Sequence, residues 1–171
     1  MLTLKNILVA TDFSEASDTA LAYGRELAGR FGATLHVLHV AENIYITTFG
    51  AETYAAMAPN LQQEVEQGAS ARLDTLLTDS DNSGPPTRPL VLTSSSPSFA
   101  IIDYAGEHEI DLIVIGTHGR GALAHLLMGS VAEKVVRLAS CPVLTVRHPQ
   151  HEFIRPDALV RVRAAGNRRA Q

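Results

Sequence analysis

Short apolar runs and helical repeats alternate along the chain. The runs are rich in Val, Ile and Leu, and they lie at residues 4–10, 34–40, 89–93, 111–115 and Val143–Val146. The run at residues 111–115 is uniformly apolar after Asp111, which is typical of a strand buried on both faces. Because the stretches between the runs carry apolar residues at helical spacing, the pattern predicts βαβ units. We therefore expect an α/β fold with a parallel open sheet and helices on both faces.

Capping residues, glycines and prolines mark the ends of the predicted helices. The first helix opens near Ser14 and stops at Gly32. A second covers residues 61–77, and the Gly- and Pro-containing stretch 81–86 breaks it. Pro97 suits the first turn of a third helix, which runs to about Glu107.

The most distinctive local pattern is a set of glycines directly after the fourth apolar run. Gly116 and Gly119 come first, and Gly129 and Ser130 follow after nine intervening residues. Glycine has no Cβ, so the main chain can come within contact distance of a phosphate. The first N–H groups of a helix have no intrahelical acceptor and lie at the positive end of its dipole. The spacing predicts an anion-sized pocket with N–H groups from Gly129 and Ser130, to which the Ser130 hydroxyl adds a hydrogen bond.

Ser130 also has a purely structural interpretation. Ser130 and Glu133 have the spacing of a capping box, in which the serine only satisfies N–H groups of its own helix. The glycines match neither the phosphate loop that ends in Gly-Lys-Ser/Thr nor the dinucleotide fingerprint. Both interpretations of Ser130 stay open at this point.

Together with residues 7–14 and 140–146, the glycine spacing resembles the ATP-binding signature of the universal stress protein family. The resemblance covers about residues 4–147. It implies a five-stranded Rossmann-like sheet of the adenine nucleotide alpha hydrolase-like type, with strand order 3-2-1-4-5. It also implies bound ATP with Mg²⁺, and a homodimer that forms through Val143–Val146.

The resemblance also assigns roles to residues. Asp12 and Val40 correspond to positions that hold the adenine, and the glycines with Ser130 correspond to positions that hold ribose and phosphates. Ala10 stands where many members have proline. On charge grounds Arg120 is a phosphate partner, with a solvated side chain as the alternative. The predicted nucleotide-binding residues are Ala10, Thr11, Asp12, Val40, Gly116, Thr117, Gly119, Arg120, Gly129, Ser130 and Val131.

Other polar residues have structural interpretations. Asp12 and Glu15 have the spacing of a helix-opening box, which is compatible with a role at the pocket. His36 and His39 are three positions apart in a strand, so they point to opposite faces and cannot bind one metal ion together. Cys141 is expected to be a small apolar residue rather than a reactive thiol.

Composition limits the cellular setting. The chain has 171 residues, a formal net charge of −4 and one cysteine. The negative charge argues against general affinity for nucleic acid, and a single cysteine excludes an intramolecular disulfide. Neither a membrane-spanning run of about 18 apolar residues nor a secretory signal is evident. We therefore expect a cytoplasmic protein without a nucleic-acid partner or a membrane span.

Charge also divides the chain into two parts. Residues 148–171 contain five arginines against Glu152 and Asp157, a formal charge of +3, which leaves −7 for residues 1–147. We expect one universal stress protein domain over 1–147 and a basic tail over 148–171. The tail has three open interpretations: disorder, return to the acidic domain, or binding of an acidic partner.

The expected function is that of an ATP-binding universal stress protein, a nucleotide-dependent switch in stress adaptation. One alternative is a slow ATPase, although no residue pattern names a general base. The other is an interaction module without nucleotide, and the intact glycine pattern argues against it.

Overall fold

Five parallel strands form one open sheet in the computed structural model, which describes residues 2–44, 60–78, 84–117 and 128–147. The strand order is β3-β2-β1-β4-β5, as expected. The tail over 148–171 lies outside the described residues. The strands are β1 (Asn6–Thr11), β2 (Thr34–Ala41), β3 (Thr87–Thr93), β4 (Leu112–Gly116) and β5 (Val143–Val146).

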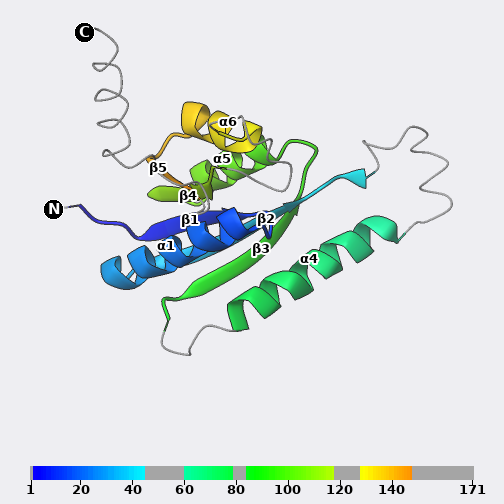
Figure 1. Cartoon of the computed structure of the whole chain (residues 1–171), viewed down its shortest axis with the longest axis horizontal. Coiled ribbons are helices and arrows are strands. Elements are labelled where there is room, and N and C mark those ends of the chain that lie inside the picture. The colour runs from blue at the N-terminus through cyan, green and yellow to red at the C-terminus, as the bar shows by residue number, and fades with distance from the viewer. Residues whose placement is uncertain (1, 45–59, 79–83, 118–127, 148–171) are drawn as a thin grey trace, which may run out of the picture.

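Helices cover both faces of the sheet, which confirms the predicted layers (Figure 1). Two helices, α1 (Glu15–Phe31) and α4 (Leu61–Thr78), pack on one face. Two more, α5 (Pro97–Glu107) and α6 (Ser130–Leu138), pack on the other. None of the helices in the described ranges is long and apolar enough to cross a membrane.

The core therefore has two layers with the sheet between them. Ile7 and Val9 of β1 pack against α1, whereas Leu8 points to the opposite face and packs with residues of α5 and α6. All three side chains are fully buried. Burial on both faces explains why the strand reads as a continuous apolar run rather than as an alternating one.

The first helix has the ends that the sequence predicts. Ser14 is its N-cap and forms a reciprocal capping box with Ser17, and Gly32 ends it in the left-handed region at φ 66°. Only glycine adopts this conformation without steric cost, so Gly32 allows the chain to turn into β2.

Helix α1 lies very close to the sheet at Gly24. A Cβ at this position would collide with Cγ2 of Val9, a stiff and fully buried side chain of β1. Gly29 in the same helix has no atom within 4 Å of the corresponding point. The absence of a side chain at Gly24 is therefore a packing requirement.

One buried polar side chain interrupts the apolar layer beneath α5. His36 of β2 is 2% exposed, its Nδ1 lies 2.8 Å from the Tyr104 hydroxyl, and its Nε2 is buried without a hydrogen-bond partner. Burial lowers the pKa of His36, and the charges of Arg88 and His108 lower it further. His39, by contrast, contacts Phe13 of the β1–α1 loop on the α1 side, so the two histidines face opposite ways as predicted.

The contact at Gly24 leads to a test with a matched control. Gly24→Ala should lower the free energy of unfolding by about 1–3 kcal/mol because Val9 has no room to move. Gly29→Ala should raise it by about 0.5–1 kcal/mol because alanine favours the helix and meets nothing. Urea denaturation measures both changes. A Gly24→Ala protein as stable as Gly29→Ala would contradict the packing.

The pKa of His36 leads to a second test. Below the usual histidine pKa of 6.5 the unfolded chain binds a proton that folded His36 resists, so stability should fall as the pH drops. Above that value this contribution is fully present. His36→Gln has no titrating ring and should lose less unfolding free energy between about pH 7.5 and about pH 5.5. Urea denaturation at both pH values decides it, and equal losses in both proteins would be evidence against a neutral His36.

Candidate functional site

The predicted site residues that the structure describes come together at one edge of the sheet. Because β1 and β4 are parallel neighbours, their carboxyl ends bring Thr11 and Gly116 to the same edge. Open α/β sheets bind ligands at this edge. Gly119 and Arg120 lie outside the described residues.

The loop between β1 and α1 is closed by side-chain hydrogen bonds. The Asp12 carboxylate accepts from the Ser14 N–H at 3.1 Å and from the Ser14 hydroxyl at 2.5 Å. The Thr11 hydroxyl is buried, accepts from the Phe13 N–H at 3.0 Å and lies 3.1 Å from the Ser17 hydroxyl. Asp12 is thus fixed by the residue that caps α1. The helix-opening box between Asp12 and Glu15 is wrong, because Ser14 takes the N-cap position.

The segment from β4 to α6 corrects two expectations. The N-cap of α6 is Gly129, and Ser130 is the first helical residue. The predicted capping box is therefore wrong, because Ser130 lies one position past the cap. The spacing also predicts that the Gly129 N–H is open to an anion. This prediction is wrong, because the N–H donates to the Thr117 carbonyl at 2.6 Å. The first turn of α6 from Ser130 onward keeps the usual N–H groups without intrahelical acceptors.

Gly116 has a structural role that is independent of any ligand. A Cβ at this position would lie 3.0 Å from the backbone carbon and oxygen of Ala16 and 3.2 Å from its Cβ. Backbone atoms cannot yield as a flexible side chain can. A glycine at 116 is therefore needed for β4 to approach the first turn of α1.

Ala10 and Val40 contribute to the apolar layer on the α5 and α6 side of the same edge. Ala10 is buried, and Val40 is half-buried against the cluster that includes Leu38 and Ile115. Val131, the second residue of α6, also packs on this cluster. These contacts place apolar atoms near the carboxyl ends of β1, β2 and β4.

The described part of the site contains hydroxyl, carboxylate and main-chain N–H groups. Within the described ranges there is no group of three or more His, Cys, Asp or Glu side chains that could hold a metal ion. Burial raises the pKa of the half-buried Cys141 thiol, as expected for a structural cysteine. The chemistry that these residues support is the binding of an anionic ligand with an apolar part.

Sequence reasoning missed two residues beside Asp12. Phe13 has a left-handed backbone, with φ 61°. The guanidinium of Arg72, from α4, lies 4.4 Å from the centre of the Phe13 ring. No sequence signal pairs these two residues, because they are far apart in the chain.

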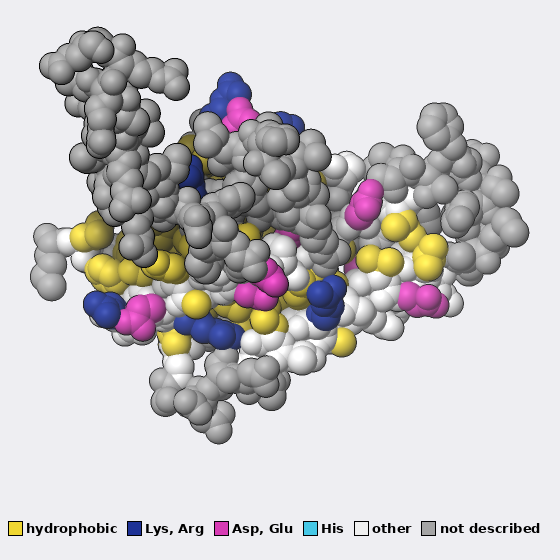
Figure 2. All heavy atoms as spheres, in the orientation of Figure 1, with side chains coloured by type: hydrophobic (Ala, Val, Ile, Leu, Met, Phe, Trp, Pro, Cys, Tyr) yellow, Lys and Arg dark blue, Asp and Glu magenta, His cyan; other side chains and the backbone are white. Residues whose placement is uncertain are grey.

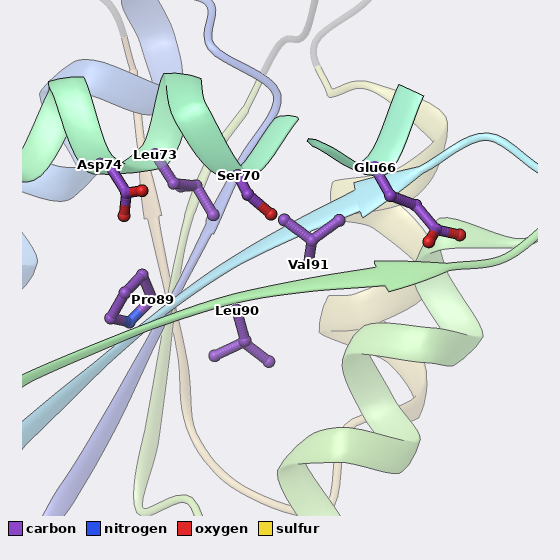
Figure 3. A pocket seen from close by; sticks show the side chains of 7 residues that line it. All are labelled: Glu66, Ser70, Leu73, Asp74, Pro89, Leu90 and Val91. Atoms are coloured by element: carbon purple, nitrogen blue, oxygen red, sulfur yellow. The ribbon is translucent and has the colours of Figure 1, made fainter. Parts of the chain in front are cut away.

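A groove lies elsewhere, between α4 and β3, with a volume of about 270 Å³ (Figure 3). Glu66, Ser70 and Asp74 line it from the helix, while Pro89 and Val91 line it from the strand. Glu66 accepts a hydrogen bond from the Thr93 hydroxyl at 2.6 Å, so this carboxylate ties the helix to the strand. None of the predicted site residues lines this groove.

The strand order, with the predicted site residues at the carboxyl ends of β1 and β4, is that of a class of open α/β proteins. The model of the universal stress protein family matches residues 3–147, and the chain belongs to this family. A universal stress protein of Thermus aquaticus is 34% identical over 143 residues, which cover 84% of this chain and 98% of that protein. One of Methanocaldococcus jannaschii is 30% identical over 148 residues, which cover 86% and 85%.

Solved structures share the fold. The universal stress protein UspA from Lactobacillus plantarum is 27% identical, with a TM-score of 0.73 over 86% of this chain and 100% of that one. Two more distant structures contain nucleotides. One is a universal stress protein in complex with cAMP, 22% identical with a TM-score of 0.58 over 86% of this chain and 99% of that one. The other is a protein from Archaeoglobus fulgidus in complex with dAMP, 21% identical with a TM-score of 0.52 over 85% and 99%.

Proposed function

We propose that this protein binds ATP at the edge formed by β1, β4 and α6, and that it acts in the cytoplasm as a nucleotide-dependent switch in stress adaptation. The observation that carries the proposal is the convergence of Asp12 and the first turn of α6 at one edge of the sheet. A carboxylate accepts a hydrogen bond from an adenine amino group, and the start of a helix favours phosphate. Relatives of the same fold that bind adenine nucleotides support this choice of ligand.

The proposed site residues have different roles. Asp12 and Val40 hold the adenine, and Ala10, Thr11 and Thr117 form the floor at the strand ends. Gly116 and Gly129 shape the main chain, whereas Ser130 and Val131 supply N–H groups and Gly119 and Arg120 complete the phosphate side. Mg²⁺ enters with ATP, since it is held largely by phosphates and water in such sites.

Ser130 separates ligand binding from fold stability. Because Ser130 is not the N-cap, Ser130→Ala should leave the free energy of unfolding nearly unchanged while it removes a hydrogen bond to phosphate. We expect ATP affinity to fall by about 1.5–3 kcal/mol, or roughly tenfold or more. Calorimetric titration measures it, with Ser140→Ala, an exposed serine past the end of α6, as the control. Equal ATP affinity in the two variants would remove Ser130 from the site.

Mass spectrometry of small molecules released from the purified protein tests the function as a whole. ATP supports the switch, and ADP favours the slow ATPase. If nothing is released and titration with ATP gives no signal, the interaction module is favoured instead.

We also propose a homodimer, formed by pairing along β5. The two outer strands of the sheet are β3 and β5. Strand β3 carries Arg88 and Pro89, and both residues disfavour pairing because one is charged and the other has no N–H to donate. Strand β5 reads Val-Leu-Thr-Val, with no charge and no proline. An outer strand of this kind is a template for a second copy of the chain.

An apolar flank of α1 lies on the same side as β5. Tyr23 and Leu27 lie seven and eleven positions after Ala16, so the three residues occupy one flank of the helix. Ala16 contacts Gly116 of β4, and Arg25 on the other flank reaches α4. Figure 2 shows hydrophobic side chains next to charged ones near the C-terminal end of α1. Tyr23 is 54% exposed, which makes it available to a partner subunit.

The hydrogen bonds of β5 identify the residue to change. The carbonyls of Pro142 and Val146 accept from Ile113 and Thr117 on the β4 side. Because alternate residues of a parallel strand face the same neighbour, the main-chain groups of Thr145 face away from β4.

Thr145→Pro should therefore remove an outward N–H without breaking the β4 ladder. We expect monomers in light scattering, whereas Thr145→Val keeps the N–H and should remain a dimer. Circular dichroism checks that both variants are folded. A folded Thr145→Pro dimer would place the interface elsewhere.

A further inference from the structure

Phe13 adopts a backbone conformation that must be held by its surroundings. Its φ of 61° lies in the left-handed region, which a residue with a bulky side chain rarely enters. Such a conformation persists only where neighbouring contacts determine it. Phe13 directly follows Asp12, so these contacts also affect the proposed adenine site.

Three contacts from within the described part of the chain hold Phe13. Its N–H donates to the Thr11 hydroxyl at 3.0 Å, and its ring lies 4.4 Å from the imidazole of His39, centre to centre. The guanidinium of Arg72 lies 4.4 Å from the centre of the same ring, within cation–π range. His39 is itself fixed, because its Nδ1 donates to the Thr11 carbonyl at 2.9 Å.

Arg72 is the contact that comes from a helix on the face of the sheet, whereas His39 comes from β2. Arg72 belongs to α4, and the next residue, Leu73, is 1% exposed in the core between α4 and the sheet. The buried leucine fixes the helix, so the guanidinium approaches Phe13 from a rigid support. The chain then continues to Ser14, whose N–H and hydroxyl both bind the Asp12 carboxylate.

We infer that Arg72 is a positioning residue for the nucleotide site. Its guanidinium packs on Phe13 and holds the β1–α1 loop in the conformation that fixes Asp12, without touching the ligand. This inference rests on the proposed function, because the ligand whose site Arg72 positions is the proposed ATP.

Arg72→Met tests this role, because it keeps a long side chain and removes the cation. Since an exposed cation–π contact is weak, we expect the Kd for ATP to rise by about two- to fivefold. Arg25→Met is the matched control. Arg25 lies on α1, and its guanidinium donates a 2.9 Å hydrogen bond to the Leu76 carbonyl of α4. It therefore joins two helices, whereas Arg72 joins α4 to the β1–α1 loop. The Kd of the Arg25→Met protein for ATP should equal that of the wild type.

Adenosine has no phosphate groups. Its binding therefore distinguishes a positioning role of Arg72 from long-range attraction between the Arg72 charge and the phosphates of ATP. If Arg72 acts through Asp12, the Kd values for adenosine and ATP rise by the same factor. A loss for ATP alone would show that the charge of Arg72 acts on the phosphates, and it would overturn the positioning role. Unchanged affinity for both ligands would overturn it as well.

Hydrogen exchange in the ligand-free protein tests the loop without any nucleotide. The amides of Phe13 and Ser14 should exchange faster in Arg72→Met than in the wild type and in Arg25→Met, because each donates within the loop. A wild-type protein that binds neither ATP nor adenosine would contradict the proposed function, and exchange alone would then decide the role of Arg72. Unchanged exchange of both amides would overturn the inference.

A double variant tests whether Arg72 acts through Phe13. Arg72 acts through the aromatic ring, so Phe13→Leu combined with Arg72→Met should weaken ATP binding no more than Phe13→Leu alone. If the two effects multiply instead, Arg72 acts independently of Phe13, and the inference fails.

Discussion

The close contact of α1 with the sheet is the constraint on which the site depends. Gly24 lets the middle of the helix approach Val9 of β1, and Gly116 lets the end of β4 approach the backbone of Ala16. These contacts set the first turn of α1 against the ends of two neighbouring strands. The loop that carries Asp12 and the end of β4 are thereby held at one edge. A side chain at either glycine would separate them, so the packing of the fold and the geometry of the site have one cause.

Much of the fold could be predicted from the sequence, because local signals agree with the tertiary structure. Each of the five apolar runs overlaps one strand, and Ser14 and Gly32 begin and end the first helix as expected. The boundaries moved by one or two residues: the third strand begins at Thr87, before the apolar part of its run. The strand order, unlike the strand positions, could not be predicted from local signals. Periodicity does not specify which strands are neighbours, and only the family resemblance supplied the order.

The candidate site was less predictable, because hydrogen bonds and backbone angles decide its details. Sequence spacing placed Ser130 at a cap, but the cap is Gly129, whose N–H is occupied by the Thr117 carbonyl. A spacing rule locates a helix start to within a residue or two, and here one position separates a capping serine from one available to a ligand. The contact between Phe13 and Arg72 has no local signature at all, since it joins residues that only the tertiary structure brings together.

Thr117 links the proposed nucleotide site to the proposed dimer edge. Its N–H donates to Val146 at the end of β5, and its carbonyl accepts from Gly129 at the start of α6. Thr117 is 2% exposed, so neither bond can be exchanged easily for water. A ligand that shifts the first turn of α6 therefore acts on a residue bonded to the last residue of β5. Coupling between two sites requires an element whose position both of them affect. Thr117 meets that requirement through two main-chain hydrogen bonds, and this gives the proposed switch a physical connection between nucleotide and partner subunit.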